Sequence, residues 1–368
     1  MWITPRPAPL NAASPSLLSA LETCPKKAGY QQDSETRGWS RPSTRTALGI
    51  AAHAFTERTL QGSPARGVSL DDWLTQMWTL VVEEQRDKLR QRWPGREVPL
   101  PTSWPGYAST KVRLIRSLKR RYQSGQISNG APGTARPVPT PRVSVGGHPP
   151  LPWVERRLED PDTGLFGYPD RVEEVDGRLR VVDLKAGVHQ GSMTSGQLRQ
   201  LLIYAHLVRV ALGRLPHEVV IVDVKGAEEQ TSVCEEMVAQ TIAKACSDVA
   251  MFNNAIESQM IPASPSSESC RWCDFRVLCE DYWEARADDW NVRGDLVGEA
   301  VSVTSGHELQ LALDSQDGAA PYRLVLPSTR DIRSGDYVVA VGCESSGFNT
   351  SRARWNSLVR VVNDRSGD

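Results

Sequence analysis

The chain has 368 residues, of which 39% are hydrophobic and 24% charged, and this composition is typical of a soluble globular protein. That length suits two or three domains, or one large domain with an appendage. No apolar run approaches the roughly 18 residues of a membrane span, and the first residues do not show the basic and apolar regions typical of a signal peptide. We therefore expect a cytoplasmic protein with no membrane partner. The net charge of −1 excludes a wholly basic nucleic-acid coat, but not a local basic groove.

Helical patterns dominate the first third of the chain. Apolar spacing predicts helices over 14–25, 43–62, 69–93 and 107–125. The last of these carries a dense basic face, formed by Lys111, Arg113, Arg116, Lys119 and Arg120. A solvated helix face is as good an interpretation of these residues as a contact with DNA phosphates. Residues 124–150 are rich in Gly, Pro and Ser, which indicates a loop or linker.

From residue 151 the pattern changes to strands. Three consecutive antiparallel strands are expected over 151–160, 165–177 and 178–187, with a tight turn, "VDGR", joining the last two. A helix ending at Gly213, a strand beginning at residue 217 and a long helix over 232–259 are then predicted.

Short strands separated by turn residues make up the chain after about residue 293. The segments "DLVGEAVSV", "ELQLALDS", "YRLVLP", "DYVVAVGC" and "SLVRVVND" each have the alternation expected of a strand. Five strands in about 75 residues predict a small β-barrel of the OB or SH3 type. The chain contains no Gly-x-x-x-x-Gly-Lys phosphate loop, so it is not expected to be an ATP-driven motor.

Two acids stand in the most β-like stretch of the sequence. In a hairpin with its turn near residue 176, Asp170 and Asp183 can lie side by side, and Lys185 shares the face of Asp183. Two adjacent carboxylates repel each other unless a cation intervenes, and Mg²⁺ favours such oxygen ligands. Lys185 could then activate a water molecule for attack on phosphorus.

A surface ion pair is the simpler interpretation of an Asp-x-Lys motif alone. The same motif occurs again as Asp223-Val224-Lys225 after a similar apolar run. That second copy has no acidic strand before it and no polar-aromatic helix after it. We therefore assign the function to Asp183 and Lys185.

Asp170, Asp183-x-Lys185 and Gln200-x-x-x-Tyr204 together resemble the core of the PD-(D/E)XK nuclease superfamily, specifically its RecB-type exonuclease branch. "LGIAAHAFTERTL" resembles the upstream helix of that branch, which carries a histidine. The resemblance implies Mg²⁺ or Mn²⁺ ligands, namely His53, Asp170, Asp183 and the backbone carbonyl of Leu184. It further implies that Lys185 handles the water and that Gln200 and Tyr204 support the DNA backbone or the lysine. Glu155 also falls where many relatives have an acid.

The resemblance implies an α/β fold with a restriction-endonuclease-like mixed central sheet flanked by helices. On this basis residues 1–290 form the nuclease domain, with a helical insertion at about 63–150. Residues 291–368 form the accessory β-barrel.

Three of the seven cysteines crowd into the segment "CRWCDFRVLC". In a reduced compartment this spacing indicates a metal site made by Cys270, Cys273 and Cys279 rather than a disulfide. A Cys-Pro followed by basic residues makes Cys24 the expected fourth ligand, because this arrangement is similar to iron–sulfur RecB-type nucleases, which include AddB-like and CRISPR-associated nucleases. The chemistry alone permits [4Fe–4S] or Zn²⁺, and the resemblance favours the cluster.

The remaining cysteines, Cys234, Cys246 and Cys343, are interpreted as ordinary buried thiols.

The sequence thus predicts a metal-dependent deoxyribonuclease that acts on single strands or duplex ends, more as an exonuclease than as an endonuclease. Repair, CRISPR adaptation and phage defence are the pathways that the resemblance suggests, with a separate helicase or defence-complex subunit as a partner. The alternative is a catalytically quiet DNA-binding or assembly subunit of such a complex. A zinc-stapled scaffold without nucleic acid would leave Asp170, Asp183 and Lys185 unexplained.

Overall fold

The structure is a computed structural model that describes residues 2–123, 150–185, 192–223, 227–287, 290, 294–304, 306–314, 320–329 and 331–362. The chain divides into two compact units, which are described here one at a time. We call Leu10–Ser19 with Ser43–Ala250 the sheet unit, and Met1–Pro9, Ala20–Pro42 and Met251–Asp368 the cysteine unit. None of the described helices is long and apolar enough to cross a bilayer. The predicted loop at 124–150 lies outside the described residues except for residue 150.

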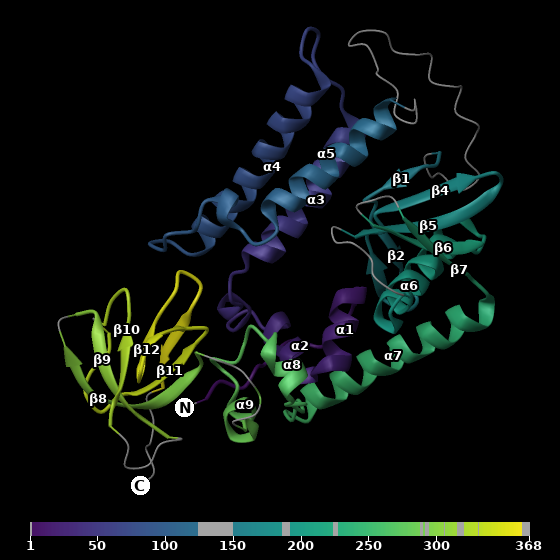
Figure 1. The fold of residues 1–368 in the computed structure, drawn as a ribbon. Helices are drawn as coiled ribbons and strands as arrows, with labels where there is room; N and C mark the ends of the chain where they lie inside the picture. Colours follow the sequence, from purple (N-terminus) through teal and green to yellow (C-terminus); the bar gives the residue numbers. More distant parts are fainter. Residues whose placement is uncertain are drawn as a thin grey trace. The chain divides into compact units, whose positions relative to one another are not determined.

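Three long helices of the sheet unit pack together: α3 (Thr44–Gln61), α4 (Leu70–Arg92) and α5 (Tyr107–Gln123) (Figure 1). The side chains of Ser43 and Ser69 accept hydrogen bonds from backbone N–H groups in the first turns of α3 and α4, which fixes where both helices begin. Phe55 and Trp78 meet edge to face in the shared core, with ring centroids 5.4 Å apart. These helices confirm the pattern predicted from apolar spacing. The short 3₁₀ turn η2 (Pro101–Ser103) joins α4 to α5.

The central sheet of this unit has the order β1-β4-β5-β6-β7. Its strands are β1 (Trp153–Val154), β4 (Arg171–Val175), β5 (Arg178–Lys185), β6 (Glu218–Asp223) and β7 (Glu228–Ser232). Only the β5–β6 pair is parallel, so the sheet is mixed, as predicted. Helix α6 (Ser195–Leu212) connects these two strands; a capping box at Thr194 and Gln197 starts it and Gly213 ends it in the left-handed conformation.

The strands predicted over 151–160 and 165–177 are wrong in their continuity. The first is interrupted at Glu155, whose φ of 47° leaves the β region, and it divides into β1 and β2 (Leu158–Asp160). The second divides into β3 (Leu165–Gly167) and β4 around Pro169, which cannot donate to a strand ladder. Strands β2 and β3 form a separate hairpin against α6, and Asp170 therefore lies just before β4 rather than within a strand. Strand β7 was not predicted from the sequence.

In the cysteine unit, seven strands form one sheet in the order β12-β13-β10-β9-β8-β11-β14. Their bounds are β8 (Leu296–Thr304), β9 (Glu308–Leu313), β10 (Tyr322–Val325), β11 (Tyr337–Val341), β12 (Glu344–Gly347), β13 (Thr350–Arg352) and β14 (Leu358–Val361). All five predicted strands are present, and β12 and β13 form an additional hairpin. Among the strand pairings of the described residues, none joins β12 to β14, so closure into a barrel stays a prediction.

Short helices surround the cysteines of this unit: α2 (Pro25–Gln32), α8 (Ser267–Arg271) and α9 (Glu280–Ala285), with the 3₁₀ turn η1 (Arg37–Trp39). Helices α1 (Pro15–Thr23) and α7 (Glu235–Glu257) complete the described elements. Cys24 and Cys279 are the N-cap residues of α2 and α9. Both residues therefore stand at helix N-termini.

Candidate metal centre and cysteine site

The β4–β5 register brings the two predicted acids together. Arg171 pairs with Val182, and continuing this antiparallel register by one residue sets Asp170 across from Asp183. Asp170 Oδ2 accepts a hydrogen bond from the backbone N–H of Leu184. Along β5, Val182 and Leu184 belong to an apolar cluster with β6, so Asp183 and Lys185 face the other side of the sheet.

Helix α3 contributes the predicted histidine to this place. His53 Nδ1 lies 3.4 Å from Asp170 Oδ1 and 3.6 Å from Glu155 Oε1. One ligand atom from each of these three residues lies within 4.8 Å of the other two. The unusual backbone of Glu155 takes part, because its N–H donates to the carbonyl of Asp170 at 3.2 Å. Glu155, which falls where many relatives have an acid, thus lies directly beside the predicted ligands His53 and Asp170.

Asp183 is buried, with 5% of its surface exposed. Its Oδ2 lies 2.6 Å from Lys185 Nζ but has no hydrogen-bond partner of good geometry. Its Oδ1 is 3.4 Å from Gln200 Nε2, which is itself 3.2 Å from the hydroxyl oxygen of Tyr204. Two sets of contacts therefore lie across the β4–β5 hairpin from each other: His53 contacts Asp170, while Lys185 and Gln200 contact Asp183 and Gln200 also contacts Tyr204. The three residues whose ligand atoms lie within 4.8 Å of one another are His53, Glu155 and Asp170, without Asp183.

The charges of the group favour a cation. Burial, reinforced by the neighbouring carboxylate of Asp170, raises the pKa of Asp183 above its usual value. Hydrogen bonds to Asp170 and Glu155 raise the pKa of His53 to about 10, so a metal that bound His53 would have to displace its proton. Clustered carboxylates, a histidine and an Asp183 oxygen without a well-directed donor fit a divalent ion.

Comparison with known proteins decides the family. Residues 12–280 match the family model described as "PD-(D/E)XK nuclease superfamily". The chain belongs to the PD-(D/E)XK nucleases. It is also similar to the gene 69 protein of Mycobacterium phage D29, with 24% identity over 281 residues that cover 73% of this chain and 97% of that protein. A solved structure from Eubacterium rectale, described as a "Putative exonuclease", aligns over 75% of this chain and 89% of its own, with a TM-score of 0.39 and 9% identity.

In this nuclease, a glycine lets Tyr204 reach the site. A Cβ added at Gly167 in β3 would lie 2.5 Å from Tyr204 Cε1, which is closer than real Cβ atoms come. The ring is buried, and burial raises the pKa of the Tyr204 hydroxyl to about 12. The hydroxyl oxygen of Tyr204 accepts the hydrogen bond from Gln200 Nε2.

Two further polar residues of the nuclease lie near these elements and were not predicted. Asp223 of β6 pairs in register with Lys185 of the parallel strand β5, so the aspartate of the Asp-x-Lys motif that we set aside lies beside the site. Its Oδ1 accepts from the backbone N–H of Ala227, and Lys225 lies outside the described residues. His206 is buried on α6 with its Nε2 2.7 Å from Asp160 Oδ2. Nothing in the local sequence pairs these last two residues, which are 46 positions apart.

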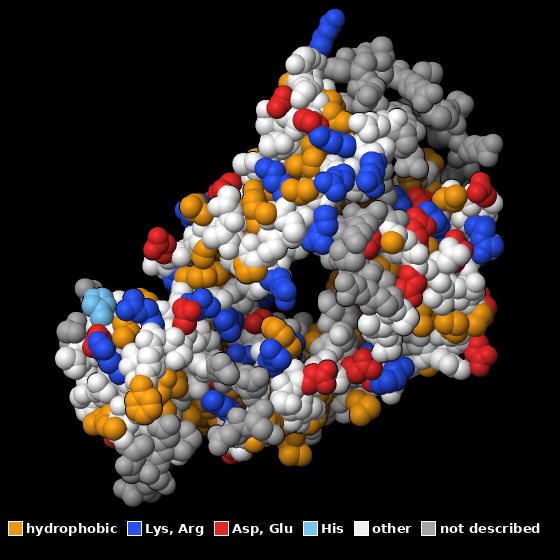
Figure 2. Space-filling view, viewed as in Figure 1, with side chains coloured by type: hydrophobic (Ala, Val, Ile, Leu, Met, Phe, Trp, Pro, Cys, Tyr) orange, Lys and Arg blue, Asp and Glu red, His pale blue; other side chains and the backbone are white. Residues whose placement is uncertain are grey.

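The basic face of α5 is mostly accessible to solvent. Arg116 and Arg120 are exposed, Lys111 and Arg113 are half-buried, and Lys119 forms an ion pair with Asp71 at 2.5 Å. Figure 2 shows Lys and Arg side chains gathered over this helix. A role for this face in DNA binding stays a prediction.

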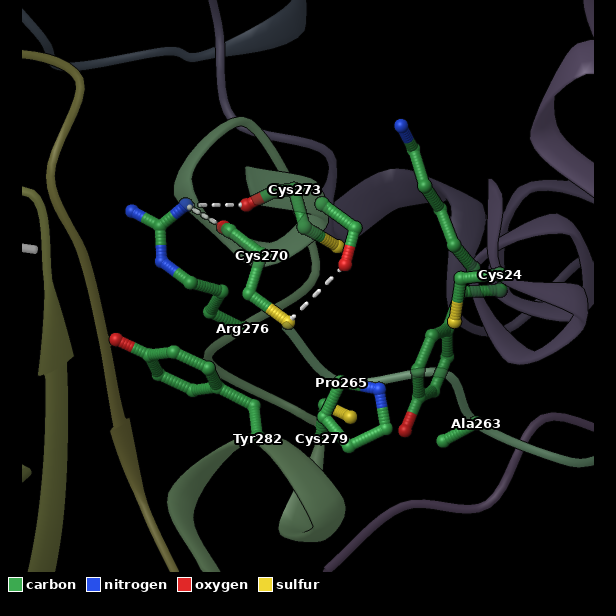
Figure 3. A pocket seen from close by; sticks show the side chains of 11 residues that line it. Cys24, Ala263, Pro265, Cys270, Cys273, Arg276, Cys279 and Tyr282 are labelled. Carbon is green, nitrogen blue, oxygen red and sulfur yellow. Dashed lines mark hydrogen bonds between the residues drawn. The ribbon is translucent and has the colours of Figure 1, made fainter. Parts of the chain in front are cut away.

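The four predicted cluster cysteines of the nuclease line one pocket. Cys24, Cys270, Cys273 and Cys279 surround it, together with Lys27, Tyr30 and Arg276 (Figure 3). None of the cysteines among the described residues forms a disulfide. Burial raises the pKa of Cys273 to about 11 and that of Cys279 to about 12, so both thiols stay protonated unless a metal binds them.

The other three cysteines differ from one another. Cys343 is buried as predicted, whereas Cys246 is half-buried and Cys234 is exposed. The prediction for Cys234 is wrong because this residue immediately precedes α7, and the first turn of that helix faces solvent.

Proposed function

We propose that this protein is a divalent-metal-dependent deoxyribonuclease of the RecB-type branch. The observation that carries the proposal is the convergence of His53, Asp170 and Asp183 with Lys185 at the end of β5. These side chains come from segments more than 100 residues apart, and a simple surface ion pair on a hairpin requires none of that assembly.

Four groups of this chain would hold the ion: His53, Asp170, Asp183 and the backbone carbonyl of Leu184, with Glu155 at its side. A bound Mg²⁺ or Mn²⁺ would supply charge stabilisation at the phosphate and a more acidic water. Asp170 also fixes the backbone at Leu184 through the hydrogen bond from its N–H. The hairpin register therefore sets the geometry of both the carboxylates and that carbonyl.

Lys185 is the residue that orients the attacking water in this proposal. Its ammonium lies against Asp183, and its side chain is about one third exposed, so it can reach a substrate phosphate. Gln200 bridges Asp183 and Tyr204, which supports a role for both in holding the carboxylate and the DNA backbone in place. Attack on phosphorus would leave a 5′-phosphate in the usual chemistry of this superfamily.

The basic face of α5 is proposed to contact DNA phosphates. Arg116 and Arg120 lie one helical turn apart and are both exposed. Replacing both with Gln should reduce the salt dependence of DNA binding by a slope of about 2, since each neutralised phosphate contributes about 0.9. An unchanged slope would mean that this face is only solvated.

For the cysteine site we propose a [4Fe–4S] cluster. Four thiols line one pocket, and a Cys₄ set suits either a cluster or a single Zn²⁺. The resemblance to iron–sulfur RecB-type nucleases supports the cluster, and a brown protein that contains iron would agree with it.

The proposed function is tested by cleavage of end-labelled single-stranded and duplex DNA with Mn²⁺ or Mg²⁺. We expect wild-type protein to degrade DNA from its ends and Lys185→Met to lose about 100-fold or more in rate. Lys244→Met is the matched control, because Lys244 is an exposed lysine of α7 that pairs with Asp248. No cleavage by wild type, with DNA binding retained, would favour the quiet assembly subunit; a circular substrate separates exonuclease from endonuclease action. A separate helicase is the protein partner to test for, because this sequence contains no Gly-x-x-x-x-Gly-Lys phosphate loop.

A further inference from the structure

Arg276 organises the segment that carries three of the cysteines. It is buried, with 4% of its surface exposed, and one guanidinium nitrogen points into the loop. That nitrogen, Nη1, donates to the backbone carbonyls of Cys270 at 2.9 Å and Cys273 at 2.7 Å (Figure 3), and to that of Arg271 at 3.1 Å. The position of Arg276 is therefore tied to the backbone on which two of the thiols stand.

The other side of Arg276 reaches the seven-stranded sheet of the same unit. Its Nε lies 2.6 Å from Asp295 Oδ2, and the side chain of Asp295 is fully buried. Tyr282 also donates to Asp295 Oδ2, at 3.0 Å, while the backbone N–H of Gly342 donates to Oδ1 at 2.8 Å. Asp295 immediately precedes β8 and Gly342 follows β11, so one carboxylate links two neighbouring strands to the cysteine segment.

A second cation, the half-buried Arg41, stands close by. Arg41 lies against Gly342, where an added Cβ would be 2.5 Å from Arg41 Cζ, and its Nε donates to the carbonyl of Asn356. Burial, and then repulsion by Arg276, lowers the pKa of Arg41. Asp295 thus pairs with Arg276 and also attracts the charge of Arg41, so a displacement of Arg276 changes the balance of this ionic network.

We propose that Arg276 and Asp295 couple occupancy of the cysteine site to the order of the C-terminal sheet. A group bound by Cys270 and Cys273 fixes their backbone, their carbonyls fix Arg276, and Arg276 in turn neutralises Asp295 at the base of β8. Linkage makes the effect reciprocal, so an ordered sheet also retains the bound group more tightly. This inference rests on the proposed function of the four cysteines as ligands.

Hydrogen exchange measured by mass spectrometry on the full chain tests the coupling. Backbone amides of β8 and β11 are compared in iron-loaded protein and in protein stripped with an oxidant and a chelator. We expect stripping to lower their protection about tenfold, within the range usual for coupled sites. The amides of β4 and β5 in the sheet unit serve as the internal reference and should not change.

Two variants separate coupling from simple structural support. Arg276→Met leaves Asp295 buried without its ion pair and should lower β8 protection even when iron is bound. The double variant Arg276→Met with Asp295→Asn removes both charges and keeps an acceptor for the Gly342 N–H. It should restore protection of β8 but release iron to a chelator several-fold faster than wild type, and stripping should no longer alter β8. Arg323→Met, which breaks an exposed ion pair in the same sheet, is the matched control and should behave as wild type.

Equal protection of β8 in loaded and stripped wild-type protein would overturn the coupling while leaving the cysteine site intact. A protein that never carries iron or zinc would instead overturn the proposed ligand set, and the coupling with it.

Discussion

The two candidate sites differ in how the chain assembles them. The carboxylate site draws on α3, the turn before β4, β5 and α6, whereas the cysteine site takes three of its four thiols from residues 270–279. Their donors also differ, since oxygen and imidazole ligands suit Mg²⁺ or Mn²⁺ and thiolates suit iron or zinc. A site built from distant elements depends on strand register and helix packing, while one built from adjacent residues depends mainly on local loop geometry.

The largest effect on cleavage at the carboxylate site is expected from Asp183→Asn. The change removes a proposed metal ligand, so cleavage should fall about 1,000-fold. It also removes a buried carboxylate whose pKa is raised by burial and by Asp170, so stability without metal should rise by about 1 kcal/mol, a trade-off usual at functional sites. Activity and thermal unfolding in EDTA measure the two effects.

Asp176→Asn is the control for that variant, because Asp176 sits in the exposed β4–β5 turn with φ of 51°, which Asn tolerates. It should leave activity and melting temperature unchanged. A loss of both activity and stability in Asp183→Asn would mean that Asp183 has only a structural role.

We expect metal binding at the cysteine site to depend mainly on its own thiols. Cys273→Ser should lower bound iron to about a tenth of the wild-type content, because loss of one thiolate weakens the whole ligand set. Cys234→Ser, an exposed thiol outside the pocket, should retain iron fully. Metal analysis of both purified variants measures this, and equal iron in the two would exclude Cys273 as a ligand.

Protons should compete with the metal ion at the carboxylate site. The pKa of His53 is raised to about 10 by Asp170 and Glu155, so a divalent ion must displace a proton and its apparent affinity should rise about tenfold per pH unit below that value. Calorimetric titration with Mn²⁺ from pH 6.5 to 8.5 measures the slope. His53→Gln should bind weakly with a flat profile, and a flat profile in wild type would argue against His53 as a ligand.

The same proton has a stability consequence in the absence of metal. A raised pKa means that protonated His53 stabilises the fold fully below its unfolded pKa of about 6.5, and that this stability is lost as the pH rises through about 10. Chemical unfolding in EDTA across this range should show the decline in wild type and a smaller one in His53→Gln.

The smallest effect on cleavage is expected from Gly167→Ala, which tests how far the carboxylate site depends on the packing of β3 against Tyr204. The added methyl group would press on Tyr204, so stability should fall by about 1–3 kcal/mol and cleavage several-fold. Gly196→Ala has open space around it on α6 and should be neutral or stabilising. Similar behaviour of both variants would show that Tyr204 tolerates displacement.

Elements with a regular apolar pattern could be predicted from the sequence. The helices with clear caps at Ser43 and Ser69, the strand that bears Asp183 and the five C-terminal strands followed from periodicity. The break at Glu155 and the position of Asp170 before β4 did not, because a positive φ and a proline interrupt an otherwise β-like pattern.

Contacts between residues far apart in the sequence were also not predicted. The packing of α6 brings His206 to Asp160, and the parallel β5–β6 register sets Lys185 beside Asp223. No local sequence motif encodes either contact. The spacing of Cys270, Cys273 and Cys279 indicated a metal site, and the family resemblance added Cys24. The link from this segment to Asp295 through Arg276 is visible only in the folded chain.

The most direct test of the central claim is a crystal of this protein grown with Mn²⁺ and analysed by anomalous scattering. We predict one strong manganese peak bounded by His53, Asp170 and Asp183, with ligand distances near those usual for small divalent ions, and no such peak in Asp170→Asn. A wild-type crystal at saturating Mn²⁺ with these side chains ordered and no ion among them would contradict the account.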